Sequence, residues 1–562
     1  MNSGTQYSPI VYWIPLLIFF IANLWIGWRS FRVQYNTADA CEEHDDFWIT
    51  GRKQPHYMVG MSIAAGWLLI GFMTWMAWAT YEHGLSGLFM AVVPWAILLF
   101  CMVALTPWVR RLKAISQPQM LHNRFGLPIR VLVSPMNIFC FIIWSAAELY
   151  AVALILAPPL GVSVSTMIII FALPVAIYMW MGGFRSVINA NILQFFMAVV
   201  FMTVMALLAW IVAKGIAADQ GATIWGILSE QKLINSFAYP LKESARATTI
   251  LGFVNLAFPI VSIIALLPGW TIEEDWWLKA QSGASTSESR KGVIANVIYN
   301  LIWVLFCASF VGLMGLVIFP PEVGQDGILA SNALLGNAGG YNMFSALIQN
   351  YVPGWGQVLL IVLLAALSMS TIATFTNVCA MNLSYDVLQP LYYRRRGFSE
   401  AKIVIWARTI SLLIVLATIG LALLYTIPSI GATLTDGYYL SSGVLTAGVA
   451  VPVYAIFWQR ANLRGVMVGS AVGCLATLIF FILEYKVWHF SYNMPVFDWI
   501  FGTGAMAGTY LGYCIVGLFF GLLGLVVGTY SASAPSLELL NAVSVHPVDD
   551  HEEFFAGVRK TS

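Results

Sequence analysis

Residues 364–371 read Leu-Ala-Ala-Leu-Ser-Met-Ser-Thr and lie inside an otherwise apolar run from Val358 to Ala373. A lipid bilayer offers no water to hydroxyl groups, so polar side chains in the middle of a membrane-spanning segment need a reason to be there. A cluster that presents several oxygens to a dehydrated cation is one such reason. The stretch therefore predicts an ion-binding helix, as in an ion-coupled carrier rather than a passive span.

The composition indicates an all-α polytopic membrane protein. The chain has 562 residues, of which 60% are hydrophobic and 9% are charged, whereas a soluble domain carries roughly 25% charged residues. A formal net charge of +1 argues against a nucleic-acid partner. The seven cysteines are scattered singly, which predicts neither a disulfide nor a metal framework.

Two further absences narrow the class of protein. The sequence contains no GxxxxGK[ST] phosphate loop, so ATP-driven transport is not expected and the driving force should be an ion gradient. It also shows no nucleophile–base arrangement and no metal-ligand spacing of histidines, so we expect no enzymatic activity.

The apolar runs predict thirteen membrane helices at about 20 residues per span. Their approximate limits are 9–30, 55–80, 84–106, 128–156, 163–181, 189–213, 246–275, 292–319, 356–385, 402–426, 431–458, 464–485 and 505–530. The polar tail from Ser531 to Ser562 follows the last of them.

Basic residues set the expected orientation. They fall in alternate connections, and such connections face the cytoplasm. They are Arg29, Arg32, Arg110, Arg111, Lys113, Arg185, Arg290, Lys291, Arg394 to Arg396, Arg460 and Arg464. This pattern predicts an N-terminus outside and a C-terminus inside, which an odd number of helices requires. The expected location is the plasma membrane, or the inner membrane if the source is bacterial.

Four motifs in order resemble the sodium:solute symporter family, which includes proline, sialic acid, pantothenate and sugar carriers. They are Asp46–Trp67, with DFWITGR and GMSIAAGW; Gly182–Gln194, GGFRSVINANILQ; the hydroxyl stretch 364–371; and Pro452–Asn462 with Gly465 and Gly469. The segment from Trp276 to Lys291 also resembles the cytoplasmic loop of this family.

The resemblance implies a LeuT-like fold of two inverted five-helix repeats with the binding site near the bilayer midplane. The repeats would cover about 55–213 and 246–458, with the first helix and the helices of about 464–530 at the periphery of a membrane domain of residues 1–530. Ala65-Gly66 and Pro268-Gly269 place small or helix-breaking residues in the first helix of each repeat.

The resemblance also implies a site for Na⁺ as the coupling ion. Carried over position by position, its ligands would be the carbonyls of Ala65, Leu68 and Leu367 and the hydroxyls of Ser370 and Thr371. Hard cations take oxygen ligands of this kind. The alternative is that Ser368, Ser370 and Thr371 only donate hydrogen bonds to carbonyls one turn earlier in their own helix.

One position departs from the family pattern. Asn191 stands where relatives often have Asp, whose carboxylate serves a second cation or a proton relay. An amide offers no charge and carries no proton, so we expect one Na⁺ per neutral solute. The alternative interpretation of Asn191 is a satisfied asparagine at a helix end.

The residues expected around the solute are mainly aromatic. They are Trp67, Phe72, Trp75, Glu148, Asn255, Phe258 and Asp436. Glu148 is exceptional because a carboxylate inside an apolar span is costly to bury. Three roles are open for it: counter-ion for an amine, proton acceptor, or hydrogen-bond anchor between helices.

The expected function is Na⁺-driven symport of a small polar organic solute, either amino-acid-like or a monocarboxylate. Two alternatives remain at this stage. One is a proton-coupled symporter that uses Glu148, and the other is a transporter-like solute sensor.

Overall fold

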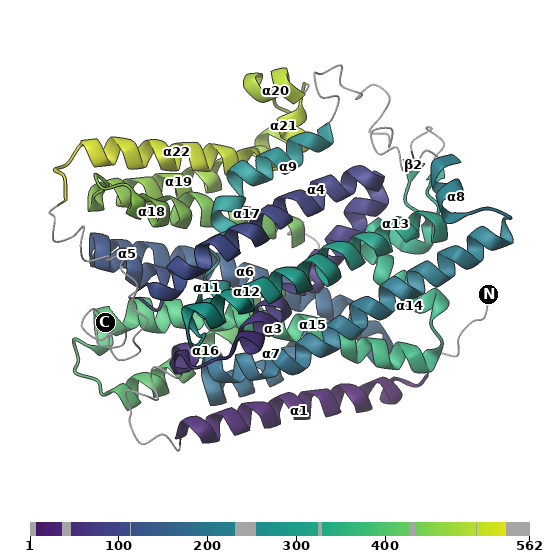
Figure 1. Ribbon diagram of the computed structural model, residues 1–562, viewed down its shortest axis with the longest axis horizontal. Coiled ribbons are helices and arrows are strands. Elements are labelled where there is room, and N and C mark those ends of the chain that lie inside the picture. Colours follow the sequence, from purple (N-terminus) through teal and green to yellow (C-terminus); the bar gives the residue numbers. More distant parts are fainter. Residues whose placement is uncertain are drawn as a thin grey trace.

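The computed structural model describes residues 7–35, 47–112, 114–230, 254–323, 329–427, 434–501 and 503–535. The described chain is helical apart from two short strands that form an antiparallel hairpin with Glu322 opposite Ala330. The helices lie side by side, with α1 along one edge of the bundle and α19 with α22 along the opposite edge (Figure 1).

The first half of the chain forms long apolar helices and a few short ones. Its elements are α1 (Pro9–Tyr35), η1 (Thr50–Arg52), α3 (His56–Trp67), α4 (Ile70–Arg111), α5 (Gln117–Phe125), α6 (Leu127–Leu160), α7 (Val164–Asp219), α8 (Ile224–Glu230), α9 (Val254–Ala265), α10 (Leu267–Trp270) and α11 (Glu274–Gln281).

The second half repeats this mixture and contains several π-helical turns. Its elements are α12 (Thr286–Tyr299), η3 (Asn300–Cys307), α13 (Ala308–Ile318), β1 (Glu322–Val323), β2 (Leu329–Ala330), η4 (Ala333–Asn342), α14 (Met343–Tyr351), α15 (Gly354–Met381), η5 (Asn382–Tyr393), α16 (Glu400–Leu424), α17 (Leu434–Val444), η7 (Leu445–Ala450), α18 (Val451–Tyr454), η8 (Ala455–Phe457), α19 (Leu463–Leu483), η9 (Glu484–Trp488), α20 (Pro495–Phe501), α21 (Ala505–Gly508) and α22 (Gly512–Tyr530).

Ten helices in the described part are long and apolar enough to cross a membrane, or up to twelve if each of two bent pairs is one span. The polytopic all-helical class is thus confirmed. The number of candidate spans is lower than the predicted thirteen because two of the predicted helices form one continuous element, α7. This element has 56 residues and a left-handed glycine, Gly183, in its interior (φ 50°, ψ −139°). A straight helix of that length would reach about 84 Å, against a hydrocarbon core of about 30 Å. The element α7 therefore contains both predicted helices, 163–181 and 189–213.

Two bent helix pairs lie at the centre of the fold. The first consists of α3 and α4, which meet at 63°, and the second of Ala257–Ala265 and Leu267–Gln281, which meet at 48°. In the first pair the helical path ends at Trp67, and Leu68 and Leu69 are non-helical. In the second pair the break precedes Pro268, whose missing N–H cannot continue the hydrogen-bond ladder. Both breaks lie within three residues of the predicted positions.

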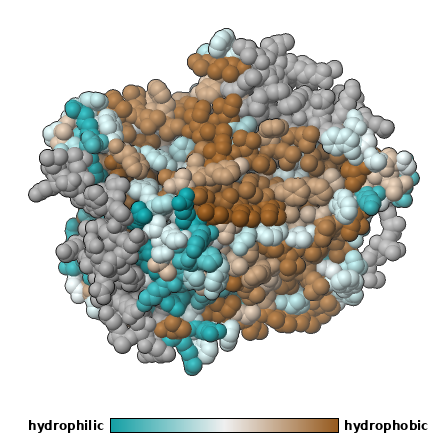
Figure 2. All heavy atoms as spheres, viewed as in Figure 1, coloured by the Kyte–Doolittle hydropathy of each residue, from teal (hydrophilic) through white to brown (hydrophobic). Residues whose placement is uncertain are grey.

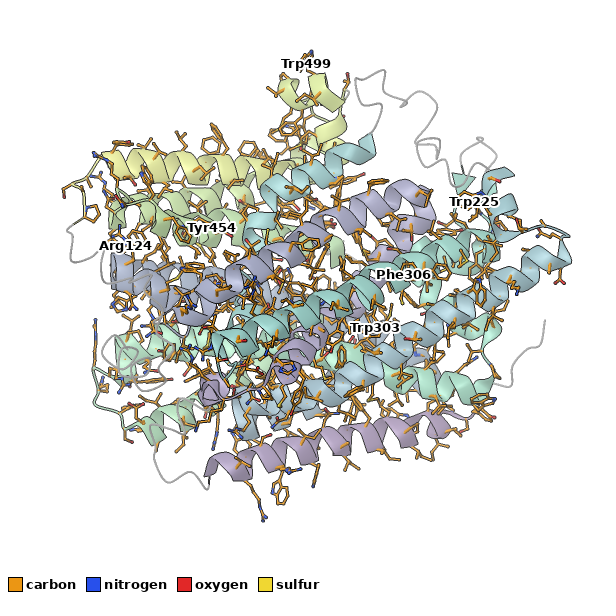
Figure 3. The ribbon with its side chains drawn as sticks, in the orientation of Figure 1. Arg124, Trp225, Trp303, Phe306, Tyr454 and Trp499 are labelled. Carbon is orange, nitrogen blue, oxygen red and sulfur yellow. The ribbon has the colours of Figure 1, made fainter. Side chains whose placement is uncertain are left out.

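The surface agrees with a membrane protein. Apolar side chains cover the middle of the visible face, and hydrophilic ones gather towards one end of it (Figure 2). Trp225 on α8 and Trp499 on α20 are 64% and 73% exposed, and they lie away from the end that carries Arg124 (Figure 3). Exposed tryptophans of this kind are typical of the interface between lipid and water.

The first part of the segment that resembles the cytoplasmic loop is helical and buried in the structure. The helix α11 continues to Gln281, and the side chains of Trp276, Trp277 and Lys279 are buried. The structure packs this segment between α3, α4 and α15.

Candidate functional site

The hydroxyls of Ser370 and Thr371 on α15 contact the last turn of α3, just before that helix breaks. Ser370 Oγ lies 2.6 Å from the carbonyl oxygen of Ala65 and 2.7 Å from that of Leu367. Thr371 Oγ1 lies 3.1 Å from the carbonyl oxygen of Gly66 and 3.4 Å from that of Leu367. The two interpretations of these hydroxyls therefore coexist, because each one contacts a carbonyl of its own helix and a carbonyl across the helix contact.

These atoms form a neutral group of oxygens that suits a hard monovalent cation. Carbonyl and hydroxyl oxygens are the donors that such a cation takes, and non-helical backbone that lines an internal site exposes carbonyls for it. Leu68 forms the C-cap of α3, and its side chain is buried. Hydrogen bonds thus bring together four of the predicted ligand residues, Ala65, Leu367, Ser370 and Thr371, and Leu68 lies at the adjacent break. The carbonyl of Gly66 belongs to the same cluster and was not predicted.

Glu148 on α6 binds the start of α4. One carboxylate oxygen accepts a hydrogen bond from the backbone N–H of Ile70 at 2.7 Å, and the other accepts one from Gly71 at 3.0 Å. Ser368 on α15 donates to the same carboxylate at 2.5 Å. The first N–H groups of a helix lack partners within it and carry partial positive charge, so a carboxylate there is stabilising. These contacts favour the role of an anchor between helices.

A buried ion pair lies beside the same break. Lys279 Nζ and Asp275 Oδ2 are 3.8 Å apart, and both side chains are fully buried. The indole N–H of Trp67, the last residue of α3, donates to this Asp275 oxygen at 3.1 Å. Sequence reasoning missed the pair, although three consecutive acidic residues at 273–275 next to an apolar run were a signal for it.

Asn191 lies near the candidate cation site. Its side-chain N–H₂ group donates to the hydroxyl of Ser62 at 3.0 Å and to the carbonyl of Ser62 at 3.3 Å. A longer contact of 3.4 Å reaches the hydroxyl of Thr374 on α15. Asn191 therefore links α7, α3 and α15 at the interior rather than at the end of its helix.

Most of the predicted aromatic residues form one connected cluster. The Phe72 ring lies 5.7 Å from Trp75, and Trp75 lies 6.0 Å from Phe258, which in turn lies 5.9 Å from Tyr439. Trp95, which was not predicted, joins this cluster to Trp67. Its ring centroid is 4.2 Å from Phe72 and 5.2 Å from Trp67.

Two predicted solute-site residues, Asn255 and Asp436, do not belong to this aromatic cluster. The side chain of Asn255 lies outside the described residues. Asp436 lies in the first turn of α17 and is half-buried. The described residues contain no group of three or more His, Cys, Asp and Glu side chains that could hold a metal ion. A site for a hard monovalent cation at the break of α3 does not depend on such a group.

A multi-pass helical bundle in which two broken helices surround neutral oxygen donors has the architecture of a secondary transporter. The chain belongs to the sodium:solute symporter family, whose model matches residues 47–473. The family resemblance of the sequence is thereby confirmed, and the chain is a member of a transporter family rather than an enzyme.

Individual relatives are distant. Sodium/glucose cotransporter 4 of Danio rerio is 22% identical over 84% of this chain and 71% of that protein. The sodium/sialic acid symporter NanT of Aliivibrio fischeri is 25% identical over 77% of this chain and 82% of that protein. A Na⁺-coupled sialic acid symporter, solved substrate-bound and outward-open, matches 94% of this chain and 99% of that chain with a TM-score of 0.68 and 18% identity. The last likeness shows a shared, LeuT-like fold.

Proposed function

We propose that this protein couples the inward movement of Na⁺ to the uptake of a small polar organic solute by alternating access. The solute is amino-acid-like or a monocarboxylate. The observation that carries the proposal is the contact of the Ser370 and Thr371 hydroxyls with the carbonyls at the broken end of α3. Na⁺ binds at this contact, with Ala65, Leu68, Leu367, Ser370 and Thr371 as its ligands. Family membership supports Na⁺ as the coupling ion.

The proposal includes the arrangement of the chain in its membrane. Thirteen spans cross the plasma membrane, or a bacterial inner membrane, with the N-terminus outside and the tail of residues 531–562 in the cytoplasm. The two repeats cover about 55–213 and 246–458. Arg124 on α5 donates hydrogen bonds to the carbonyls of Gln459 and Ala461. This contact supports a location of both connections, each expected in the cytoplasm, at the same end of the bundle.

The solute is identified by ligand-induced stabilisation of the purified protein. A ligand that binds only the native state raises its melting temperature. We therefore expect one class of solute in a panel of amino acids, sugars, polyols and monocarboxylates to raise the melting temperature, and to do so more strongly with NaCl than with choline chloride. The same solute should enter proteoliposomes only under an inward Na⁺ gradient. Uptake driven by a pH gradient without Na⁺ would instead support proton coupling.

Asn191 leads to a prediction about stoichiometry. With an amide in place of a carboxylate, the region of Ser62 and Thr374 offers no charge to a second Na⁺. Initial uptake rates against Na⁺ concentration should therefore give a Hill coefficient of about one. Movement of one charge per cycle should also make uptake faster under an inside-negative potential, which supplies about 2.3 kcal/mol per charge per 100 mV. A Hill coefficient of about two would contradict the assignment.

A further inference from the structure

Lys279 places a positive charge directly beside the proposed Na⁺ site. A Cβ atom built on Gly66 would lie 2.5 Å from Lys279 Nζ and 3.4 Å from Thr374 Oγ1. The ammonium group is therefore packed against the backbone of the residue whose carbonyl oxygen accepts the hydrogen bond from Thr371. The neighbouring carbonyl, that of Ala65, accepts from Ser370. The ammonium and the proposed Na⁺ ligands thus share one contact between α3, α11 and α15.

The ammonium group is incompletely paired where it lies. Its side chain is fully buried, and Nζ makes no hydrogen bond within the described ranges of the chain. Asp275 Oδ2 is 3.8 Å away, which exceeds hydrogen-bond distance. An ammonium group has three donors, and a buried one is stable only when it is paired and hydrogen-bonded. Lys279 therefore lacks the hydrogen bonds that a buried ammonium group requires, and both Asp275 and the oxygens at the end of α3 are potential acceptors.

We propose that Lys279 is a tethered cation that competes with Na⁺ for the carbonyl oxygens at the break of α3. Without Na⁺, the ammonium group approaches these oxygens. When Na⁺ binds, repulsion between two positive charges in a buried site moves the ammonium group to Asp275. This inference rests on the Na⁺ site of the proposed function and adds a resident competitor to it.

Asp275 connects the movement of the Lys279 ammonium group to the end of α3. The same oxygen that faces Lys279 also accepts the indole N–H of Trp67, which is the last residue of α3. An ammonium group that approaches Asp275 changes the charge next to this hydrogen bond. Binding of Na⁺ at the break therefore changes the electrostatic environment of Trp67, the last residue of α3.

The test compares two variants with opposite expected effects on direct Na⁺ binding. Lys279→Met removes the competitor, so the concentration of ²²Na⁺ for half-maximal binding to the purified protein should fall at least about tenfold. Asp275→Asn removes the alternative partner of the ammonium group and keeps the shape of the side chain. The ammonium group then stays at the carbonyl oxygens, and the same concentration should rise by at least about tenfold.

The matched control is Lys214→Met, which removes one positive charge from an exposed position on α7. It should leave ²²Na⁺ binding unchanged. If Lys279 has only a structural role, both Lys279→Met and Asp275→Asn should weaken Na⁺ binding, and this outcome would overturn the inference. Unchanged binding in both variants would do the same. If Lys279→Met does not fold, Lys279→Gln takes its place with the same expectation.

The Ser370→Ala/Thr371→Ala variant separates this inference from the proposed function. If it keeps normal ²²Na⁺ binding, the site itself is wrong. If it loses Na⁺ binding while the Lys279 and Asp275 variants behave as wild type, the site stands and the competition by Lys279 is wrong.

Discussion

Replacement of Ser370 and Thr371 by alanine together should abolish Na⁺-stimulated uptake while the protein stays in the membrane. Each substitution removes one hydroxyl oxygen from the contact between α15 and the end of α3. Interactions of such oxygens with a charged partner are worth about 1.5–3 kcal/mol each. Loss of two should therefore weaken Na⁺ binding by about two to four orders of magnitude.

The measurement is solute uptake into proteoliposomes over a range of external Na⁺ concentrations, with ²²Na⁺ binding in parallel. Thr376→Val is a suitable control, because the Thr376 hydroxyl lies on the same helix and donates to the carbonyl of Ile372 rather than to α3. It should keep a Na⁺ dependence close to that of wild type. Normal Na⁺ dependence in the double variant would remove Ser370 and Thr371 from the list of ligands.

Replacement of Glu148 by leucine should destabilise the protein strongly. The substitution leaves the buried N–H groups of Ile70 and Gly71 without an acceptor. Each unpaired buried donor costs about 1–3 kcal/mol, so the native state should lose about 2–6 kcal/mol. The expected result is a marked fall in the melting temperature of the purified protein, accompanied by loss of uptake.

Glu148→Gln separates the anchor from the two other roles considered for this carboxylate. The amide keeps one acceptor oxygen but loses the charge, so an intermediate melting temperature is expected. Coupling to Na⁺ should persist in whatever protein remains folded. A Glu148→Gln variant with the stability of wild type and no uptake would instead indicate a proton acceptor or a counter-ion for an amine.

Much of the central site could be predicted because it depends on local features of the chain. A run of hydroxyls within an apolar segment indicates a polar contact inside the membrane. The two helix breaks lie close to Gly66 and Pro268, residue types that disfavour a regular helix. Four predicted ligand residues, Ala65, Leu367, Ser370 and Thr371, therefore come together in the structure, and the role of the predicted set in binding Na⁺ stays a prediction.

The features that could not be predicted depend on contacts between distant segments. Glu148 meets Ile70 across 78 positions of the chain and Ser368 across 220. The periodicity of apolar and polar residues does not predict contacts between residues so far apart in the chain. The resemblance of residues 276–291 to a loop gave no indication that the charge of Lys279 is buried against Asp275 and Gly66, because those contacts depend on how α11 packs against α3.

The middle of α15 is linked to both parts of the bent pair, α3 and α4. Ser368 is linked through Glu148 to the first residues of α4, while Ser370 and Thr371 contact the last residues of α3. Ser368 and Thr371 are three residues apart and therefore share one face of α15. Any displacement of α15 would therefore disturb its contacts with both parts of the broken segment at the same time.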